Sequence, residues 1–83
     1  MTTPGLDARD LDVLAFEQEW WRHAEGRDEA VRARFGLEPV AYHRLLGELI
    51  DRPEAEAAEP LLVRRLRRQR DARRRERAER RRG

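Results

Sequence analysis

The sequence predicts an all-α protein with a three-helix head, which contains a helix-turn-helix, and a basic C-terminal helix. Apolar residues recur at spacings of three and four, the period of a helix with one buried face. Residues that start or stop helices stand between these runs. Residues 1–60 hold 7 Arg and 14 acidic residues, a net charge of −7, whereas residues 61–83 hold 12 Arg and 3 acidic residues, a net charge of +9. The 83 residues suffice for one small domain.

These patterns divide the chain into four parts. They are a flexible N-terminus at 1–6, a helical head at 7–52 with its helix-turn-helix at about 28–50, an acidic bridge with prolines at 53–60, and an arginine-rich helical tail at 61–83. The end of the tail is expected to be frayed or disordered. Such a charge asymmetry suggests that the tail meets a polyanion, while the head keeps the chain soluble or meets a different partner.

The first helix is expected to begin at Asp7, which can act as N-cap with Asp10 in the first turn. Leu6 is placed to pack on Leu11 as a hydrophobic staple. Glu17 lies between two apolar stripes, so it faces a solvent gap or pairs with an arginine from another segment. The stripes together are wider than one packing face, and they predict two neighbouring helices; they consist of Val13, Phe16, Trp20 and Ala24, and of Leu11, Leu14 and Trp21.

The turn into a second helix is expected at Gly26, which can close the first helix in a left-handed conformation, with Asp28 as the next N-cap. Gly36 then ends the second helix with a positive φ. Pro39 suits the first turn of a third helix. The buried face of that third helix should consist of Tyr42, Leu45, Leu46, Leu49 and Ile50.

A helix-turn-helix needs a turn glycine flanked by inward apolar residues, because two crossed helices must seal a small shared core. With Gly36 as that glycine, all five apolar positions are filled, by Val31, Phe35, Leu37, Tyr42 and Leu45. One position departs from the pattern of the motif. Four residues before the glycine, where the two helices touch most closely and a small residue is usual, the chain has Arg32. An ordinary three-helix bundle with a glycine in its hairpin is the competing interpretation. If the motif is present, the third helix would offer Val40, His43, Arg44 and Gly47 to DNA bases.

The fourth helix can start at Pro60, and its first residues can dock on the head through Leu61, Leu62, Val63 and Leu66. Beyond Leu66 the chain offers nothing apolar larger than alanine, so this part should be exposed. Its arginines could bind phosphate groups. On duplex DNA each such contact should contribute about −0.9 to the slope of log K against log salt concentration. The candidates are Arg64, Arg65, Arg67, Arg68, Arg70, Arg73, Arg74 and Arg75.

The residue types present exclude most catalytic chemistry. The chain has no Cys, Ser, Asn or Lys, so it lacks disulfides, thiol and serine nucleophiles and lysine Schiff bases. No catalytic residue, metal site or cofactor is predicted. Nothing at the start of the sequence resembles a signal peptide, and no apolar run approaches the roughly 20 residues that cross a bilayer, so a cytoplasmic, nucleoid-associated protein without a membrane partner is expected.

The neighbouring residues Trp20 and Trp21 have two interpretations. Adjacent aromatic residues on a wide apolar helix usually belong to the core. An exposed tryptophan would instead mark a protein interface. The pair is therefore a candidate interface for another protein, such as a component of the transcription machinery.

Three runs carry a resemblance to a known family: FEQEWWRH, FGLEPVAYHRLLGELIDRPEA and PLLVRRLRR. Over about residues 6–70 the chain resembles a small actinobacterial family of uncharacterised proteins, a domain of unknown function. The resemblance implies an all-helical, cytoplasmic protein from a high-GC bacterium. It brings no established activity and no catalytic residues.

The function expected from these observations is non-enzymatic DNA binding associated with transcription, on double-stranded DNA. The third helix would read bases and the arginine tail would clamp phosphates. The alternative is an adaptor that binds a protein through the first helix and its tryptophans, with the tail on nucleic acid. In a third arrangement the tail folds onto the acidic head of the same or a neighbouring chain. Helix-turn-helix proteins usually bind as dimers, so a homodimer is considered, although no clear dimerisation helix is visible.

Overall fold

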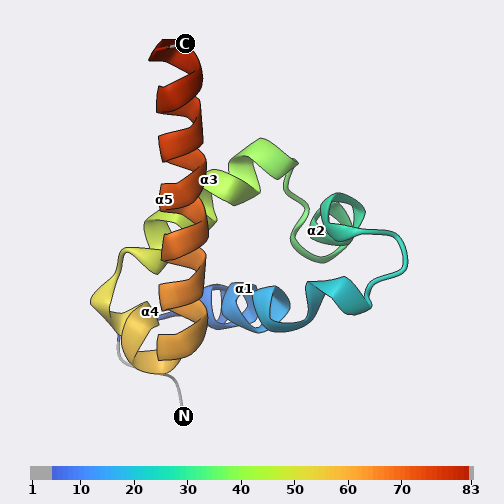
Figure 1. Ribbon diagram of the computed structural model, residues 1–83. Coiled ribbons are helices and arrows are strands. Elements are labelled where there is room, and N and C mark those ends of the chain that lie inside the picture. The colour runs from blue at the N-terminus through green and yellow to red at the C-terminus, as the bar shows by residue number, and fades with distance from the viewer. Residues whose placement is uncertain (1–4, 83) are drawn as a thin grey trace.

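The computed structural model describes residues 5–82, and in that part of the chain all regular structure is helical (Figure 1). This confirms the all-α prediction. The elements are α1 (Ala8–Glu19), the short 3₁₀ turn η1 (Trp20–Arg22), α2 (Arg27–Phe35), α3 (Pro39–Ile50), α4 (Pro53–Ala58) and α5 (Pro60–Arg82). Helices α1 to α4 form the head, and α5 rises from it as a rod whose far half stands clear of the other helices (Figure 1).

Helix α1 begins as the sequence predicts. Asp7 is the N-cap: its Oδ1 accepts a hydrogen bond from the N–H of Asp10 at 2.8 Å, and Asp10 Oδ2 accepts one from the N–H of Asp7 at 3.2 Å. Leu6 is buried in the core, against which Leu11 also packs. Leu6, predicted to belong to the flexible N-terminus, is therefore part of the head, and residues 1–4 lie outside the described residues.

The first helix ends earlier than predicted. At Glu19 the backbone (φ −143°, ψ 16°) leaves the helical region, and the chain continues in the 3₁₀ turn η1. A 3₁₀ turn has 3.0 residues rather than 3.6, so Trp20 and Trp21 do not continue the apolar stripes of α1. Gly26 does not close α1; it has φ +88° and is the N-cap of α2, so Asp28 lies in the first turn of α2 instead of capping it.

The connection between α2 and α3 follows the sequence pattern. Gly36 adopts the left-handed conformation (φ +65°, ψ 25°), and its N–H donates to the Arg32 carbonyl oxygen at 3.0 Å. Pro39 occupies the first turn of α3. The buried face of α3 consists of Tyr42, Leu46, Leu49 and Ile50, with Leu45 half-buried beside them.

Alanine substitutions at Gly36 and Gly47 should have opposite effects on stability, because only Gly36 has a left-handed backbone conformation. We expect Gly36→Ala to lower the free energy of unfolding by about 1–2 kcal/mol, because a side chain strains the left-handed conformation. A Cβ at either Gly36 or Gly47 would meet no atom within 4 Å, so steric clash contributes nothing. Gly47 is inside α3, where alanine should raise the free energy of unfolding by about 0.5–1 kcal/mol. Urea unfolding monitored by circular dichroism measures both, and the same sign for both would contradict the left-handed turn.

The segment predicted as an acidic bridge is largely helical. Pro53 occupies the first turn of α4, and Ala55 is fully buried. The backbone breaks only at Glu59 (φ −141°, ψ 73°), after which α5 starts at Pro60 as predicted. Helix α5 then continues to Arg82, and Gly83 lies outside the described residues.

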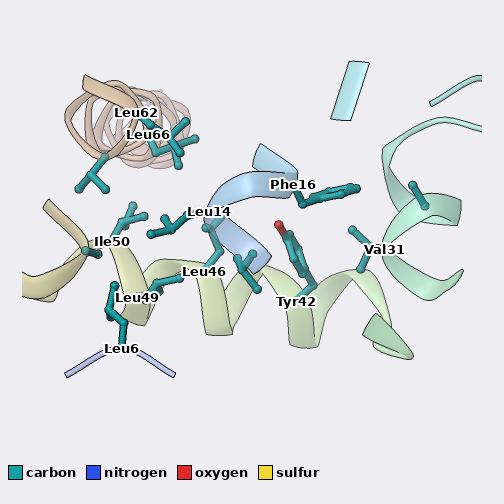
Figure 2. Packing of buried hydrophobic residues seen from close by; sticks show 14 residues of the cluster. Leu6, Leu14, Phe16, Val31, Tyr42, Leu46, Leu49, Ile50, Leu62 and Leu66 are labelled. Atoms are coloured by element: carbon teal, nitrogen blue, oxygen red, sulfur yellow. The ribbon is translucent and has the colours of Figure 1, made fainter. Parts of the chain in front are cut away.

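The core joins all the longer helices. Leu14 of α1 and Ile50 of α3 meet Leu62 and Leu66 of α5, and Tyr42 extends from α3 toward α1 with its hydroxyl group directed at that helix (Figure 2). Val63 is also buried, so three of the four apolar residues expected to dock α5 do so. The exception is Leu61, which is 80% exposed because it lies on the outer side of the first turn of α5.

Candidate functional site

A cleft of about 950 Å³ lies between η1, α3 and α5. We call it the arginine cleft, because seven of its lining residues are arginines and only three are acidic. The arginines are Arg27, Arg44, Arg65, Arg70, Arg73, Arg74 and Arg77, and the acidic residues are Glu17, Glu48 and Asp51. The cleft is thus strongly positive although the head as a whole is acidic.

Helix α3 contributes all four predicted base-reading residues to the arginine cleft: Val40, His43, Arg44 and Gly47. They lie on the side of α3 opposite its buried face. Val40 is 73% exposed, and His43 and Arg44 are exposed. The side chains of His43 and Arg44 make no hydrogen bond or ion pair within residues 5–82, so both are free to meet a ligand.

The electrostatic surroundings of His43 show that α5 lies close to this side of α3. Partial burial, and the positive charges of Arg27 and Arg73, lower the pKa of His43 below its usual value. Arg73 belongs to α5 and His43 to α3, so charges on the two sides of the cleft act on each other. The imidazole is neutral at pH 7 and offers one donor and one acceptor nitrogen.

The predicted phosphate-binding arginines separate into two groups around α5. Residues 65, 69, 73 and 77, together with 66, 70 and 74, fall on one side of a helix with 3.6 residues per turn, and all of them line the cleft. Four of the eight predicted arginines belong to this side: Arg65, Arg70, Arg73 and Arg74. Arg64, Arg67, Arg68 and Arg75 do not line the cleft.

Arg77 lies on the cleft side but was not among the predicted arginines. Its spacing of four from Arg73 is the sequence signal that could have identified it. Two of the three acidic residues in this part of the chain, Asp71 and Glu79, fall on the other side of α5, so the cleft side is the more positive one.

Three arginines at the base of α5 fasten this helix to the head. Arg67 Nε donates to the carbonyl oxygen of Ile50 at 2.6 Å, at the C-terminal end of α3, where a cation is favourable. Arg70 Nη1 is 2.8 Å from Asp51 Oδ1, and Arg64 Nε is 3.4 Å from Glu56 Oε1. The base of the tail therefore packs on the head of its own chain, while the arginines from Arg73 onward make no ion pair with the head within the described residues.

The tryptophan side of the cleft differs from the core position that the apolar stripes suggested. Trp20 is 36% exposed and Trp21 is 58% exposed. The guanidinium carbon of Arg27 lies 5.8 Å from the centre of the Trp20 ring, in cation–π range. Trp21 makes no comparable aromatic or cationic contact in the described part of the chain, so its indole is the freer of the two.

A buried charged cluster lies behind the cleft. Glu17 is only 2% exposed, and Arg27 Nη2 donates to its two carboxylate oxygens at 2.9 and 3.0 Å. This confirms the arginine pairing that was one of the two alternatives for Glu17. The Tyr42 hydroxyl group also donates to Glu17. Burial and the charge of Glu17 raise the pKa of Tyr42, so the hydroxyl group stays protonated. The cluster joins α1, α2 and α3.

The sequence pattern of one protein family matches residues 5–78, nearly the whole chain. The chain belongs to that family, which is described as a protein of unknown function (DUF3263). The expected resemblance to a family of unknown function is thereby confirmed. No curated protein and no solved structure matches the chain significantly. Within the described residues of this family member, no helix is long and apolar enough to cross a membrane, and no group of three or more His, Cys, Asp or Glu is arranged to hold a metal ion.

Proposed function

We propose that the protein is a non-enzymatic DNA-binding protein associated with transcription, which holds DNA between α3 and α5. The observation that carries this proposal is the arginine cleft, where seven arginines face three acidic residues. Guanidinium groups suit phosphate oxygens because their planar donors can bind two oxygens at once. A strand that touches the outer side of α3 also lies within reach of α5, because both line one cleft.

Helix α3 is proposed as the reading helix of a helix-turn-helix formed by α2 and α3. The left-handed Gly36 and the buried Val31 and Tyr42 support this interpretation. Arg44 can donate to two acceptors of guanine, and His43 can meet a base edge or a phosphate. Val40 can contact a thymine methyl group, and Gly47 leaves room for a close approach.

The phosphate clamp is proposed for the cleft side of α5, with Arg65, Arg73 and Arg74 from the predicted set and with Arg77 in addition. Arg70 also lines the cleft, but its guanidinium group pairs with Asp51 and Asp71, so we assign it a positioning role. Arg64 and Arg67 hold the helix to the head, so we assign them a positioning role. Arg68 and Arg75 are exposed on the other side of α5, where they can contribute only long-range attraction.

The proposed setting is the nucleoid in the cytoplasm of an actinobacterium. Arginine is the only basic residue type apart from two histidines, which supports a GC-rich source. Reading two half-sites of duplex DNA would require a homodimer, as is usual for helix-turn-helix proteins.

A fluorescence-anisotropy titration with duplex DNA at several salt concentrations tests this proposal. We expect salt-dependent binding by the full chain, and Arg44→Ala should lose about 1–3 kcal/mol of discrimination at one base position. Arg9→Ala removes the same charge from an exposed site on α1 outside the cleft and should leave discrimination unchanged. An equal loss for all sequences in Arg44→Ala would refute the reading role. Absence of binding at low salt would refute binding of duplex DNA.

A second candidate function is a protein-binding adaptor of the transcription machinery. The exposure of Trp21 and Val40 in one cleft favours it, because exposed aromatic residues are enriched at protein interfaces. The Arg44→Ala titration separates the two candidates, since an adaptor whose tail holds nucleic acid binds all sequences alike and loses no discrimination when Arg44 is replaced.

A further inference from the structure

The exposed indole of Trp21 has no role in a clamp made only of α3 and α5. A tryptophan left 58% exposed keeps a large apolar surface in water, and no aromatic or cationic partner covers it in the described part of the chain. It lines the same cleft as the free arginines of α5. Flat aromatic surface and phosphate-binding charge thus line one cleft.

We propose that the arginine cleft takes a single-stranded stretch of DNA, with an unpaired base stacked on Trp21 and the adjoining phosphates on Arg73 and Arg77. This inference rests on the proposed function and adds unpaired DNA as a further ligand of the cleft, beside the duplex that α3 is proposed to read. Transcription requires DNA strands to separate locally, so such a ligand is consistent with the proposed setting.

The indole favours an unpaired base over a paired one. In a duplex both faces of each base are covered by its neighbours, whereas an unpaired base can stack on an aromatic side chain. Every base has such a face, so stacking demands no particular sequence. The Trp20 ring lies against the guanidinium group of Arg27, whereas Trp21 presents an uncovered ring.

The arginines on the α5 side are spaced to follow a strand. Arg73 and Arg77 are one turn apart, about 6 Å along the helix axis, so successive side chains can reach successive phosphates. Arg73 of α5 and His43 of α3 line the same cleft, so a strand bound there lies between the two helices. Asp51 lines the cleft as well, but Arg70 already neutralises it at 2.8 Å.

Charge alone would favour the duplex over the single strand, so a preference for the single strand would indicate base stacking. Counterion release gives a slope of about −0.9 per phosphate contact on duplex DNA and about −0.7 on a single strand, so a purely electrostatic site favours the duplex. The full chain is titrated by anisotropy with a labelled oligothymidine of about 20 nucleotides and with a duplex of the same length. Quenching of intrinsic tryptophan fluorescence reports stacking in the same samples.

We expect the full chain to bind the single strand more tightly than the duplex. Trp21→Ala should weaken single-strand binding by about 5- to 150-fold and leave duplex binding unchanged, and Trp21→Phe should restore part of the loss. Leu61→Ala is the matched control, because Leu61 is also exposed but lies outside the cleft, and it should change neither affinity.

Three results would overturn the inference. If the duplex is preferred and Trp21→Ala has no effect on the single strand, the cleft does not take an unpaired base, although DNA binding stands. If polyglutamate competes as well as oligothymidine per unit charge, the site recognises an anionic chain such as an acidic protein segment and no base. If neither DNA binds, the proposed function fails together with the inference.

Discussion

Replacement of Arg27 by alanine is expected to lower the free energy of unfolding by about 3–5 kcal/mol, because it leaves the buried carboxylate of Glu17 without its cation. The effect should fall toward the lower end of that range, since 20% of the Arg27 side chain is exposed and the Tyr42 hydroxyl group still donates to Glu17. A domain of this size has a total stability of roughly 4–12 kcal/mol. Urea unfolding monitored by circular dichroism at neutral pH measures the change.

The control for this substitution removes both charges together. The double variant Glu17→Leu with Arg27→Met fills similar volume with apolar groups, and it should regain most of the stability that Arg27→Ala loses. It also removes the acceptor of the Tyr42 hydroxyl group, so a residual loss of about 1 kcal/mol is expected. If Arg27→Ala unfolds at the same urea concentration as the unsubstituted chain, the buried pair does not hold α1 and α2 together.

The triple variant Arg73→Gln, Arg74→Gln and Arg77→Gln is expected to flatten the salt dependence of duplex binding. Three phosphate contacts at about 0.9 each should reduce the slope of log K against log salt by about 2.7, and affinity at low salt should fall accordingly. Anisotropy titrations at several salt concentrations measure the slope. These side chains are exposed, so the fold should be retained.

The matched control carries the same charge change on the other side of α5, as Arg68→Gln, Arg75→Gln and Arg82→Gln. It should leave most of the slope intact, because these residues do not line the cleft. Equal flattening by both variants would mean that the tail acts as diffuse charge without a preferred side. Substitution is preferable to truncation after Pro60, because truncation would also remove the buried Leu62, Val63 and Leu66.

The local features of the fold could be predicted because each depends on a few neighbouring residues. Asp7 caps its helix through Asp10, three positions away, and Gly36 and Pro39 set the turn between α2 and α3 through their own backbone preferences. In contrast, α4 was missed because two prolines and a run of acidic residues resemble a linker. This short helix is stabilised by the burial of Ala55 against other helices, which a local pattern does not reveal.

The composition of the candidate site could be predicted only in part. The residues on the outer side of α3 follow from helical spacing, and all four line the cleft. The side of α5 that meets them depends on how Leu62, Val63 and Leu66 dock, which is a tertiary property. The position of Trp21 in the same cleft depends on the backbone break at Glu19, for which the sequence shows no turn residue.

The uninterrupted helix α5 constrains how the length of the chain can vary among relatives. Residues 71–82 span about 18 Å of α5 and are exposed along their whole length, so no buried side chain fixes how many residues follow Arg70. An insertion just after Arg70 rotates every later side chain by about 100° per added residue, however. Seven added residues, close to two turns, would keep the arginines on the same side of α5 but about 10 Å further along it, whereas two would turn them to the other side. We therefore expect insertions at this point to have lengths close to whole helical turns. An insertion of another length would indicate a relative in which these arginines do not face the cleft.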